Sequence, residues 1–184
     1  MKKIILAAIA VMGFTFANAQ TAGFAKGDVF ISGAFNVGSQ KTGDNKSSDF
    51  TLVPSVGYFV TENIAIGAKL GFGSTKVGDD KTNDFTAGAF GRYYFTPASQ
   101  FSVFGQAGLD FTNSKAGEFK SNEVGVNLGL GLSYFLSKHF AIETTWAGLG
   151  YNVNNNGGHG AEKTNSFGLG TDLRDVSFGV IYKF

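Results

Sequence analysis

Apolar and polar residues alternate along most of the chain with a period of two. The alternation is clearest at the end, where every second residue is apolar: Val176, Phe178, Val180, Tyr182 and Phe184. Successive side chains of a β-strand point to opposite faces, so such a segment predicts a strand with one apolar face. We delimit eight such segments: about Val29–Gly38, Phe50–Val60, Ile64–Gly73, Phe85–Phe95, Phe101–Phe111, Val124–Phe135, Phe140–Gly150, and a last one that starts between Phe167 and Leu173 and ends at Phe184.

The faces opposite the bulky apolar ones are small or polar. The segment Val124–Phe135 places five such residues there: Gly125, Asn127, Gly129, Gly131 and Ser133. A soluble β-sandwich would turn a polar face to water and pack bulky residues inside. A membrane barrel inverts this order, with bulk facing lipid and small residues inside. The glycines favour the barrel, because a strand exposed to water gains nothing from glycine.

The predicted connections alternate between short and long. The short ones are Thr61–Asn63, Thr96–Gln100 and Ser137–His139, and the long ones are about Ser39–Asp49, Ser74–Asp84, Thr112–Glu123 and Asn152–Ser166. The segments Lys41–Thr51 and Lys76–Thr86 are related by a repeat that keeps 7 of 11 residues. A repeat of this size fits two strands with one long and one short connection, which is one step around a barrel.

Aromatic residues gather beside the short connections and at the end of the chain. They occur as pairs before each short connection: Tyr58-Phe59, Tyr94-Phe95 and Tyr134-Phe135. We expect an aromatic girdle at one membrane interface. Its predicted members are Tyr58, Tyr93, Phe95, Tyr134, Tyr182 and Phe184.

The beginning of the chain predicts an export signal. Lys2 and Lys3 precede the apolar run Ile4–Phe16, and Ala17 and Ala19 form an A-x-A cleavage site. The run is shorter than the roughly 20 apolar residues of a membrane-spanning helix. We therefore expect a signal peptide at residues 1–19 and one mature domain at 20–184. The formal net charge of +1 gives no case for a nucleic-acid partner, and the lack of cysteine excludes disulfides and thiolate metal sites.

The segment Pro54–Phe59, followed by Ile64-Ala-Ile-Gly67, resembles a hairpin of the outer membrane protein β-barrel domain family, and so does the strand that ends at Phe184. This resemblance to barrels of the OmpA, OmpX and OmpW type implies an all-β, eight-stranded antiparallel up-and-down transmembrane β-barrel. It also implies an integral protein of the outer membrane of a Gram-negative bacterium, with both termini in the periplasm. The implied partners are outer-membrane lipid and the barrel assembly machinery, which would recognise the terminal strand Val176–Phe184. Pro54 cannot donate to a strand ladder, so we expect a bulge or a missing hydrogen bond there.

Counting inward positions along the predicted strands places five charged residues in the lumen: Lys69, Arg92, Glu143, Asp110 and Asp175. Ionised groups in a narrow lumen need partners or water. They are either a charge gate in a pore or a structural ion-pair network that fills the interior. The network predicts that Arg92 and Lys69 both pair with Glu143.

No pattern in the chain predicts an enzyme, a metal site or a cofactor. The acidic clusters around Asp49 and Asp84 lack the spacing of a calcium loop, and neither His139 nor His159 has a preorganised catalytic setting. The leading functional hypothesis is a structural or surface-interaction scaffold with four extracellular loops, which could meet an unknown extracellular ligand. The alternative is a narrow porin-like channel for small or apolar solutes.

Overall fold

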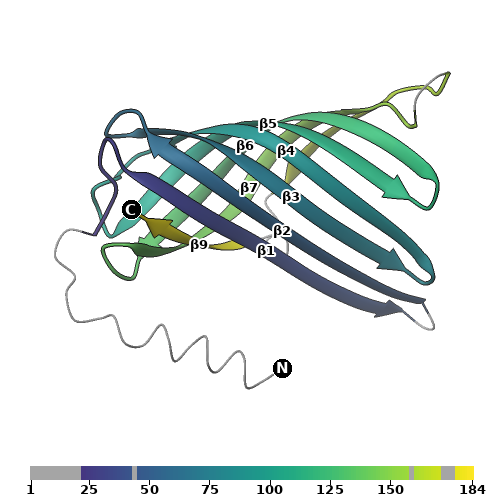
Figure 1. Cartoon of the computed structure of the whole chain (residues 1–184), viewed down its shortest axis with the longest axis horizontal. Coiled ribbons are helices and arrows are strands. Elements are labelled where there is room, and N and C mark those ends of the chain that lie inside the picture. Colours follow the sequence, from purple (N-terminus) through teal and green to yellow (C-terminus); the bar gives the residue numbers. More distant parts are fainter. Residues whose placement is uncertain (1–21, 43–44, 158–159, 171–176) are drawn as a thin grey trace.

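The computed structural model describes residues 22–42, 45–157, 160–170 and 177–184, and these form a closed β-barrel (Figure 1). The strands are β1 (Val29–Thr42), β2 (Asn45–Phe59), β3 (Ile64–Val77), β4 (Asp80–Tyr94), β5 (Phe101–Ala116), β6 (Phe119–Phe135), β7 (Phe140–Asn154), β8 (Thr164–Gly170) and β9 (Ser177–Lys183). All neighbouring strands are antiparallel, and pairing of β1 with β9 and of β6 with β7 closes the circle.

The last position of the barrel is shared by β8 and β9. Both pair with β7: β8 along Gly148–Asn154 and β9 along Phe140–Thr145. The two together therefore act as one strand, and the prediction of an eight-stranded antiparallel up-and-down barrel is confirmed. Val176 and Asp175 lie outside the described residues, as do the predicted cleavage residues Ala17 and Ala19.

The two ends of the barrel differ. One end carries the short connections and both termini of the described chain, where the Phe184 N–H donates to the Val29 carbonyl at 3.0 Å. We call this the short-turn end. The opposite end carries the connections β1–β2, β3–β4, β5–β6 and β7–β8, and we call it the hairpin end.

Three of the four connections that the sequence predicts to be long loops are instead continuations of the strands. β3 and β4 stay paired up to Val77 and Asp80, and β5 and β6 up to Ala116 and Phe119. The turns that remain begin with Gly78 (φ 61°) and Gly117 (φ 59°), at the position where a type II′ hairpin turn places glycine. The polar residues of these segments keep the period of two, and their backbone groups bond to each other across the hairpin.

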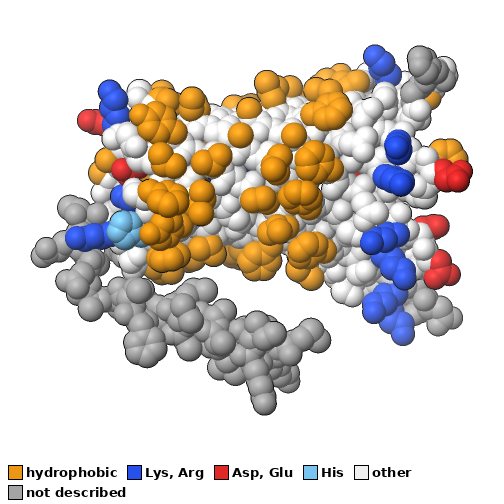
Figure 2. Space-filling model, viewed as in Figure 1, with side chains coloured by type: hydrophobic (Ala, Val, Ile, Leu, Met, Phe, Trp, Pro, Cys, Tyr) orange, Lys and Arg blue, Asp and Glu red, His pale blue; other side chains and the backbone are white. Residues whose placement is uncertain are grey.

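The bulky apolar faces point away from the lumen, as the alternation predicts. Phe35 is 54% exposed and Leu128 is 50% exposed, whereas the inward Phe59 and Phe104 are fully buried. Figure 2 shows hydrophobic side chains over the middle of the outer surface, with charged side chains toward the two ends. No helix among the described residues is long and apolar enough to cross a membrane.

Among the described strands, the ladders are irregular at two places. The β2–β3 pairing breaks between Leu52↔Phe72 and Ser55↔Lys69 without a change of register, which confirms missing ladder bonds at Pro54 and excludes a bulge there. A register shift occurs instead on β7, where Ala147 pairs with Leu130 and Thr145 with Gly131. Trp146 is the extra residue, so the outward-facing positions of β7 are even-numbered before it and odd-numbered after it.

Candidate functional site: the barrel lumen

In the described part of the lumen, two ion pairs join different strands. Arg92 of β4 reaches Glu143 of β7, with 2.7 Å between Nη1 and Oε2, and both side chains are only 7% exposed. Lys69 of β3 binds Asp110 of β5, with 2.9 Å between Nζ and Oδ2. The expectation that Lys69 pairs with Glu143 is wrong. Asp175, the fifth predicted lumen charge, lies outside the described residues.

The partner of Lys69 follows from the strand register. Lys69 lies opposite Gly88 on β4, and Gly88 lies opposite Asp110 on β5. The glycine has no side chain, so the lysine and the carboxylate meet over it, and a Cβ there would collide with the Asp110 carboxylate. Asn127 also donates to Asp110 Oδ2, at 2.7 Å. This register cannot be derived from the spacing of charges along the chain.

The guanidinium of Arg92 is held on all sides by polar groups and aromatic rings. Its Nε donates to Gln106 Oε1 at 2.7 Å, and its Nη1 donates to the Tyr94 hydroxyl at 3.2 Å as well as to Glu143. The guanidinium carbon lies 4.5 Å from the ring centroid of Phe104 and 5.0 Å from that of Phe90. A cation stacked on rings and paired with a carboxylate keeps its charge at low cost away from water.

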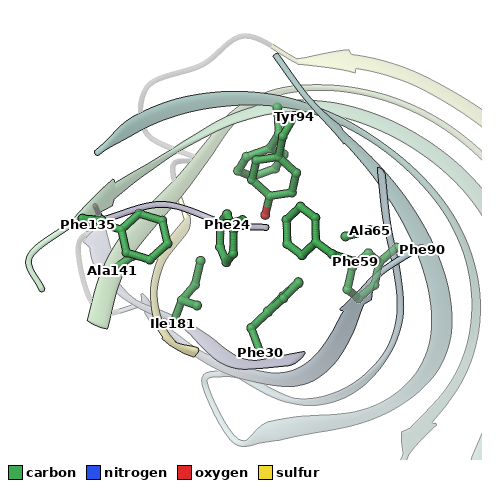
Figure 3. Close-up of a cluster of buried hydrophobic side chains, with 11 residues drawn as sticks. Phe24, Phe30, Phe59, Ala65, Phe90, Tyr94, Phe135, Ala141 and Ile181 are labelled. Atoms are coloured by element: carbon green, nitrogen blue, oxygen red, sulfur yellow. The ribbon is translucent and has the colours of Figure 1, made fainter. Parts of the chain in front are cut away.

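An aromatic cluster closes the lumen between Arg92 and the short-turn end. The predicted inner faces are small or polar, but this part of the lumen is filled by buried rings and two aliphatic side chains. We call this set the aromatic plug; its members are Phe24, Phe30, Phe59, Ala65, Tyr94, Phe104, Phe135 and Ile181. Figure 3 shows the Phe24 side chain inside the ring of strands, among the side chains of the other labelled plug residues.

The aromatic pairs that precede the short connections therefore split between the two faces. Tyr58 is 47% exposed on the outer surface, whereas its neighbour Phe59 belongs to the plug. Tyr134 and Phe135 divide in the same way. The predicted girdle residues Tyr58, Tyr93, Phe95, Tyr134 and Phe184 are solvent-accessible in the protein alone, and Tyr182 is partly covered by contacts with Phe140 and Phe184. Phe178 and Val180 of the predicted assembly signal also face outward.

Each phenylalanine of the plug that lies on a strand is opposite a small residue on the next strand. The pairs in register are Phe30↔Gly57, Phe59↔Ala65, Phe104↔Gly131 and Phe135↔Ala141, and Phe90↔Gly67 repeats the arrangement beside Arg92. A Cβ on Gly57, Gly67 or Gly131 would collide with the facing ring. The glycines Gly67 of β3 and Gly131 of β6 therefore make room for rings at these points.

Phe24 enters the plug from the segment before β1. Its N–H donates to the Pro97 carbonyl at 2.7 Å, and its ring lies 4.6 Å from Phe59 and 4.8 Å from Phe135, between centroids. Lys183 at the end of β9 donates to the Gly23 carbonyl at 2.5 Å and pairs with Asp28 at 3.2 Å. The sequence gives no periodic signal for Phe24, because the segment before β1 is not a strand.

A polar cavity of about 460 Å³ lies in the lumen toward the hairpin end. Its lining includes Lys69, Asp84, Thr86, Asp110 and Glu123. The acidic residue Asp84, predicted to lie in a solvated loop, thus belongs to a strand and faces the lumen. Among the described residues, no three histidine, aspartate or glutamate side chains lie close enough to hold a metal ion together.

Comparison with known proteins agrees with this architecture. A family model described as outer membrane protein beta-barrel domain matches residues 6–184. The outer membrane protein OprG from Pseudomonas aeruginosa is similar at 18% identity, over 90% of this chain and 99% of that one, with a TM-score of 0.55. Neisserial surface protein A matches with the same identity and TM-score over 88% of this chain and 99% of its own. The N-terminal barrel domain of Pseudomonas aeruginosa OprF matches at 19% identity over 88% and 100%, with a TM-score of 0.51. The search of curated proteins finds no match.

Proposed function

The chain belongs to the outer membrane protein beta-barrel domain family, and on that premise we propose that it is a closed scaffold that displays its hairpins outside the cell. That the chain is an integral outer-membrane β-barrel follows from the family. The proposal adds that the lumen does not conduct and that the hairpin end faces outward. It assigns the lumen charges a structural role, and it involves no catalytic step.

The observation that carries the proposal is the aromatic plug. Phe30, Phe59, Tyr94, Phe104 and Phe135 have no exposed surface, and Phe24 is 2% exposed. Their rings lie about 5 to 6 Å apart between centroids, which is the spacing of packed aromatic side chains. Ion conduction needs a continuous polar path through the lumen. The apolar aromatic plug across the lumen supports a barrel without such a path.

The plug and the lumen ion pairs reinforce each other. Arg92 contacts the rings of Phe90 and Phe104 on one side and Glu143 on the other, so the charged layer is packed onto the apolar one. A gate that opens would have to separate a buried cation from its carboxylate, which costs several kcal/mol. This arrangement favours a rigid interior over a gate.

A narrow channel is the second candidate, and the polar cavity at the hairpin end favours it. The cavity is about 460 Å³ and reaches Lys69 and Asp110 in the lumen. A channel would require Phe24 and its neighbours to leave the short-turn end. The scaffold needs no such change.

Single-cysteine labelling tests the display of the hairpins, because the chain has no cysteine of its own. Asp79→Cys and Glu118→Cys place a thiol at the tip of a hairpin, and Glu62→Cys and Lys138→Cys place one in a short connection. A membrane-impermeant maleimide on intact cells should label the first two and spare the others. Labelling of the short connections alone would reverse the orientation, and equal labelling of all four would exclude a membrane-spanning arrangement.

A further inference from the structure

Three hairpins each carry two lysines directly opposite one another. The pairs are Lys41↔Lys46 in β1–β2, Lys76↔Lys81 in β3–β4 and Lys115↔Lys120 in β5–β6. All six side chains are exposed, and they make up six of the chain's 15 lysine and arginine residues. Like charges directly opposite in a strand pair destabilise it. The same unfavourable lysine pair occurs at the same height on three hairpins. It therefore needs an explanation other than the stability of the hairpins.

The six lysines share the outer face with the apolar belt. On each strand, the residue four positions toward the middle of the barrel is bulky and apolar, in the pairs Val37↔Phe50, Phe72↔Phe85 and Phe111↔Val124. Alternation therefore turns the lysines to the same outer side. Four strand residues span about 13 Å, or about 10 Å along the axis of a tilted barrel. The ammonium groups, on long flexible stems, lie at the level where a membrane's headgroups cover its hydrocarbon core.

A polar layer separates the lysines from the apolar belt. The intervening outward pairs are Ser39↔Ser48, Ser74↔Asn83 and Asn113↔Asn122. Hydroxyl and amide groups both donate and accept hydrogen bonds, as sugar hydroxyls do. Each hairpin thus presents, in order, an apolar patch, hydrogen-bonding groups and two cations. A phosphorylated glycolipid presents the complementary order of acyl chains, sugar and phosphate.

The carboxylates of the same hairpins do not neutralise these lysines. Asp84 and Glu123 line the lumen cavity, on the opposite face of their strands. Asp79, Asp80 and Glu118 lie between the lysines and the hairpin tips, and the Asp49 carboxylate lies over Gly38. Within the described part of the chain none of the six lysines forms an ion pair with a carboxylate. Figure 2 shows the basic side chains at the hairpin end between the hydrophobic belt and acidic side chains farther out. The positive charge is therefore directed at what surrounds the barrel.

We propose that Lys41, Lys46, Lys76, Lys81, Lys115 and Lys120 form a lysine collar that binds the phosphate groups of a phosphorylated glycolipid in the leaflet around the hairpin end. This inference rests on the proposed function, since it requires the hairpin end to lie at the outer leaflet. Lysine ammonium groups bind phosphate as point charges without a fixed geometry, which suits a fluid lipid surface. A pair of lysines on each hairpin matches a headgroup that carries more than one phosphate.

Lipid binding to the folded mature protein in neutral detergent tests the collar. The probes are lipid A with two phosphates, enzymatically dephosphorylated lipid A, and inorganic pyrophosphate as a soluble competitor. Each lysine should contribute about fivefold in affinity, so K76Q/K81Q should weaken binding of phosphorylated lipid A by about 25-fold. K26Q/K138Q removes two exposed lysines from the short-turn end and should leave it unchanged. Three results would overturn the proposal. The unmodified protein could bind both lipid A forms equally, or the two double variants could lose the same affinity. Pyrophosphate at the same concentration as the lipid could also displace it fully.

Lys81→Glu separates a lipid-binding role from a structural one. It replaces a like-charge pair by an opposite-charge pair with Lys76, so the hairpin should resist denaturant at least as well as before. Binding of phosphorylated lipid A should nevertheless fall by more than tenfold. A variant that loses stability and keeps its lipid affinity would contradict the collar. Failure of the unmodified protein to insert into bilayers would overturn the proposed function as well, whereas insertion without preference for phosphate would overturn the collar alone.

Discussion

The ring of Phe24 lies over the ring of Phe59, with 4.6 Å between centroids and 25° between planes. Phe59 ends β2, whereas Phe24 belongs to the segment that precedes the first strand. The contact therefore brings a residue from outside the barrel wall into its lumen. The closed short-turn end is therefore built from this segment as well as from the strands.

Replacing Phe24 by alanine should destabilise the folded protein. Truncation of a buried phenylalanine in a core costs about 3 to 5 kcal/mol, and we expect about 3 kcal/mol here because the site is at one end of the plug. Urea unfolding in detergent micelles, followed by the fluorescence of the single tryptophan, measures the change. Phe119→Ala is the matched control, because that ring is 83% exposed. Equal effects of the two substitutions would remove Phe24 from the plug.

The pair Arg92–Glu143 should behave as a buried ion pair. Glu143→Gln leaves the guanidinium without its carboxylate, and breaking a buried pair in this way costs about 3 to 5 kcal/mol. Arg92→Met combined with Glu143→Leu removes both charges and should recover most of that loss. Unfolding free energies of the single and double variants give the coupling between the two residues. Additive losses would show that the two side chains do not interact.

Glycine at position 131 should be required for packing. A Cβ there would collide with the ring of Phe104, so Gly131→Ala should lower the unfolding free energy by about 1 to 3 kcal/mol. Gly91→Ala is the control, since nothing lies within 4 Å of a Cβ at that position. It should change stability by less than about 0.5 kcal/mol, or raise it slightly. Loss of stability in the control alone would contradict the packing of Phe104 on Gly131.

Restoring an amide at position 54 should complete the β2–β3 ladder. Pro54→Thr supplies the N–H that the break between Leu52 and Ser55 lacks, and one added backbone hydrogen bond contributes about 0.5 to 1.5 kcal/mol. Hydrogen exchange should show the new amide to be as protected as those of neighbouring strand residues. Rapid exchange there, with no gain in stability, would mean that the break has a cause other than proline.

The strands and their outer faces could be predicted from the sequence because lipid imposes a simple rule. Every outward position must be apolar across the membrane, so residues such as Ile66 and Leu128 reveal the period of two directly. The positions of the short connections follow from the same pattern. The length of the hairpins could not be predicted in this way. Polar residues with a period of two, as around Lys76 and Lys81, have the same composition as a loop.

The interior could be predicted only as a set of inward positions, since its contacts depend on register between strands. The inward position of Phe30 is explained by Gly57 opposite it, which leaves room for the ring. The pairing of Lys69 with Asp110 is explained by Gly88, which lies between them. The detectable signal was the tandem of two aromatic residues at Tyr58-Phe59, because neighbours on a strand cannot share a face. One of the two rings must therefore point into the lumen.

The measurement that tests the closed lumen most directly is single-channel conductance of the mature protein, residues 20–184, in a planar bilayer. Protein that is demonstrably folded and inserted should give no discrete openings, whereas Phe24→Ala should give brief openings if the segment before β1 is what seals the short-turn end. Reproducible openings of the unmodified protein, sensitive to Arg92→Ala or Glu143→Ala, would contradict the closed scaffold and place this barrel among the channels.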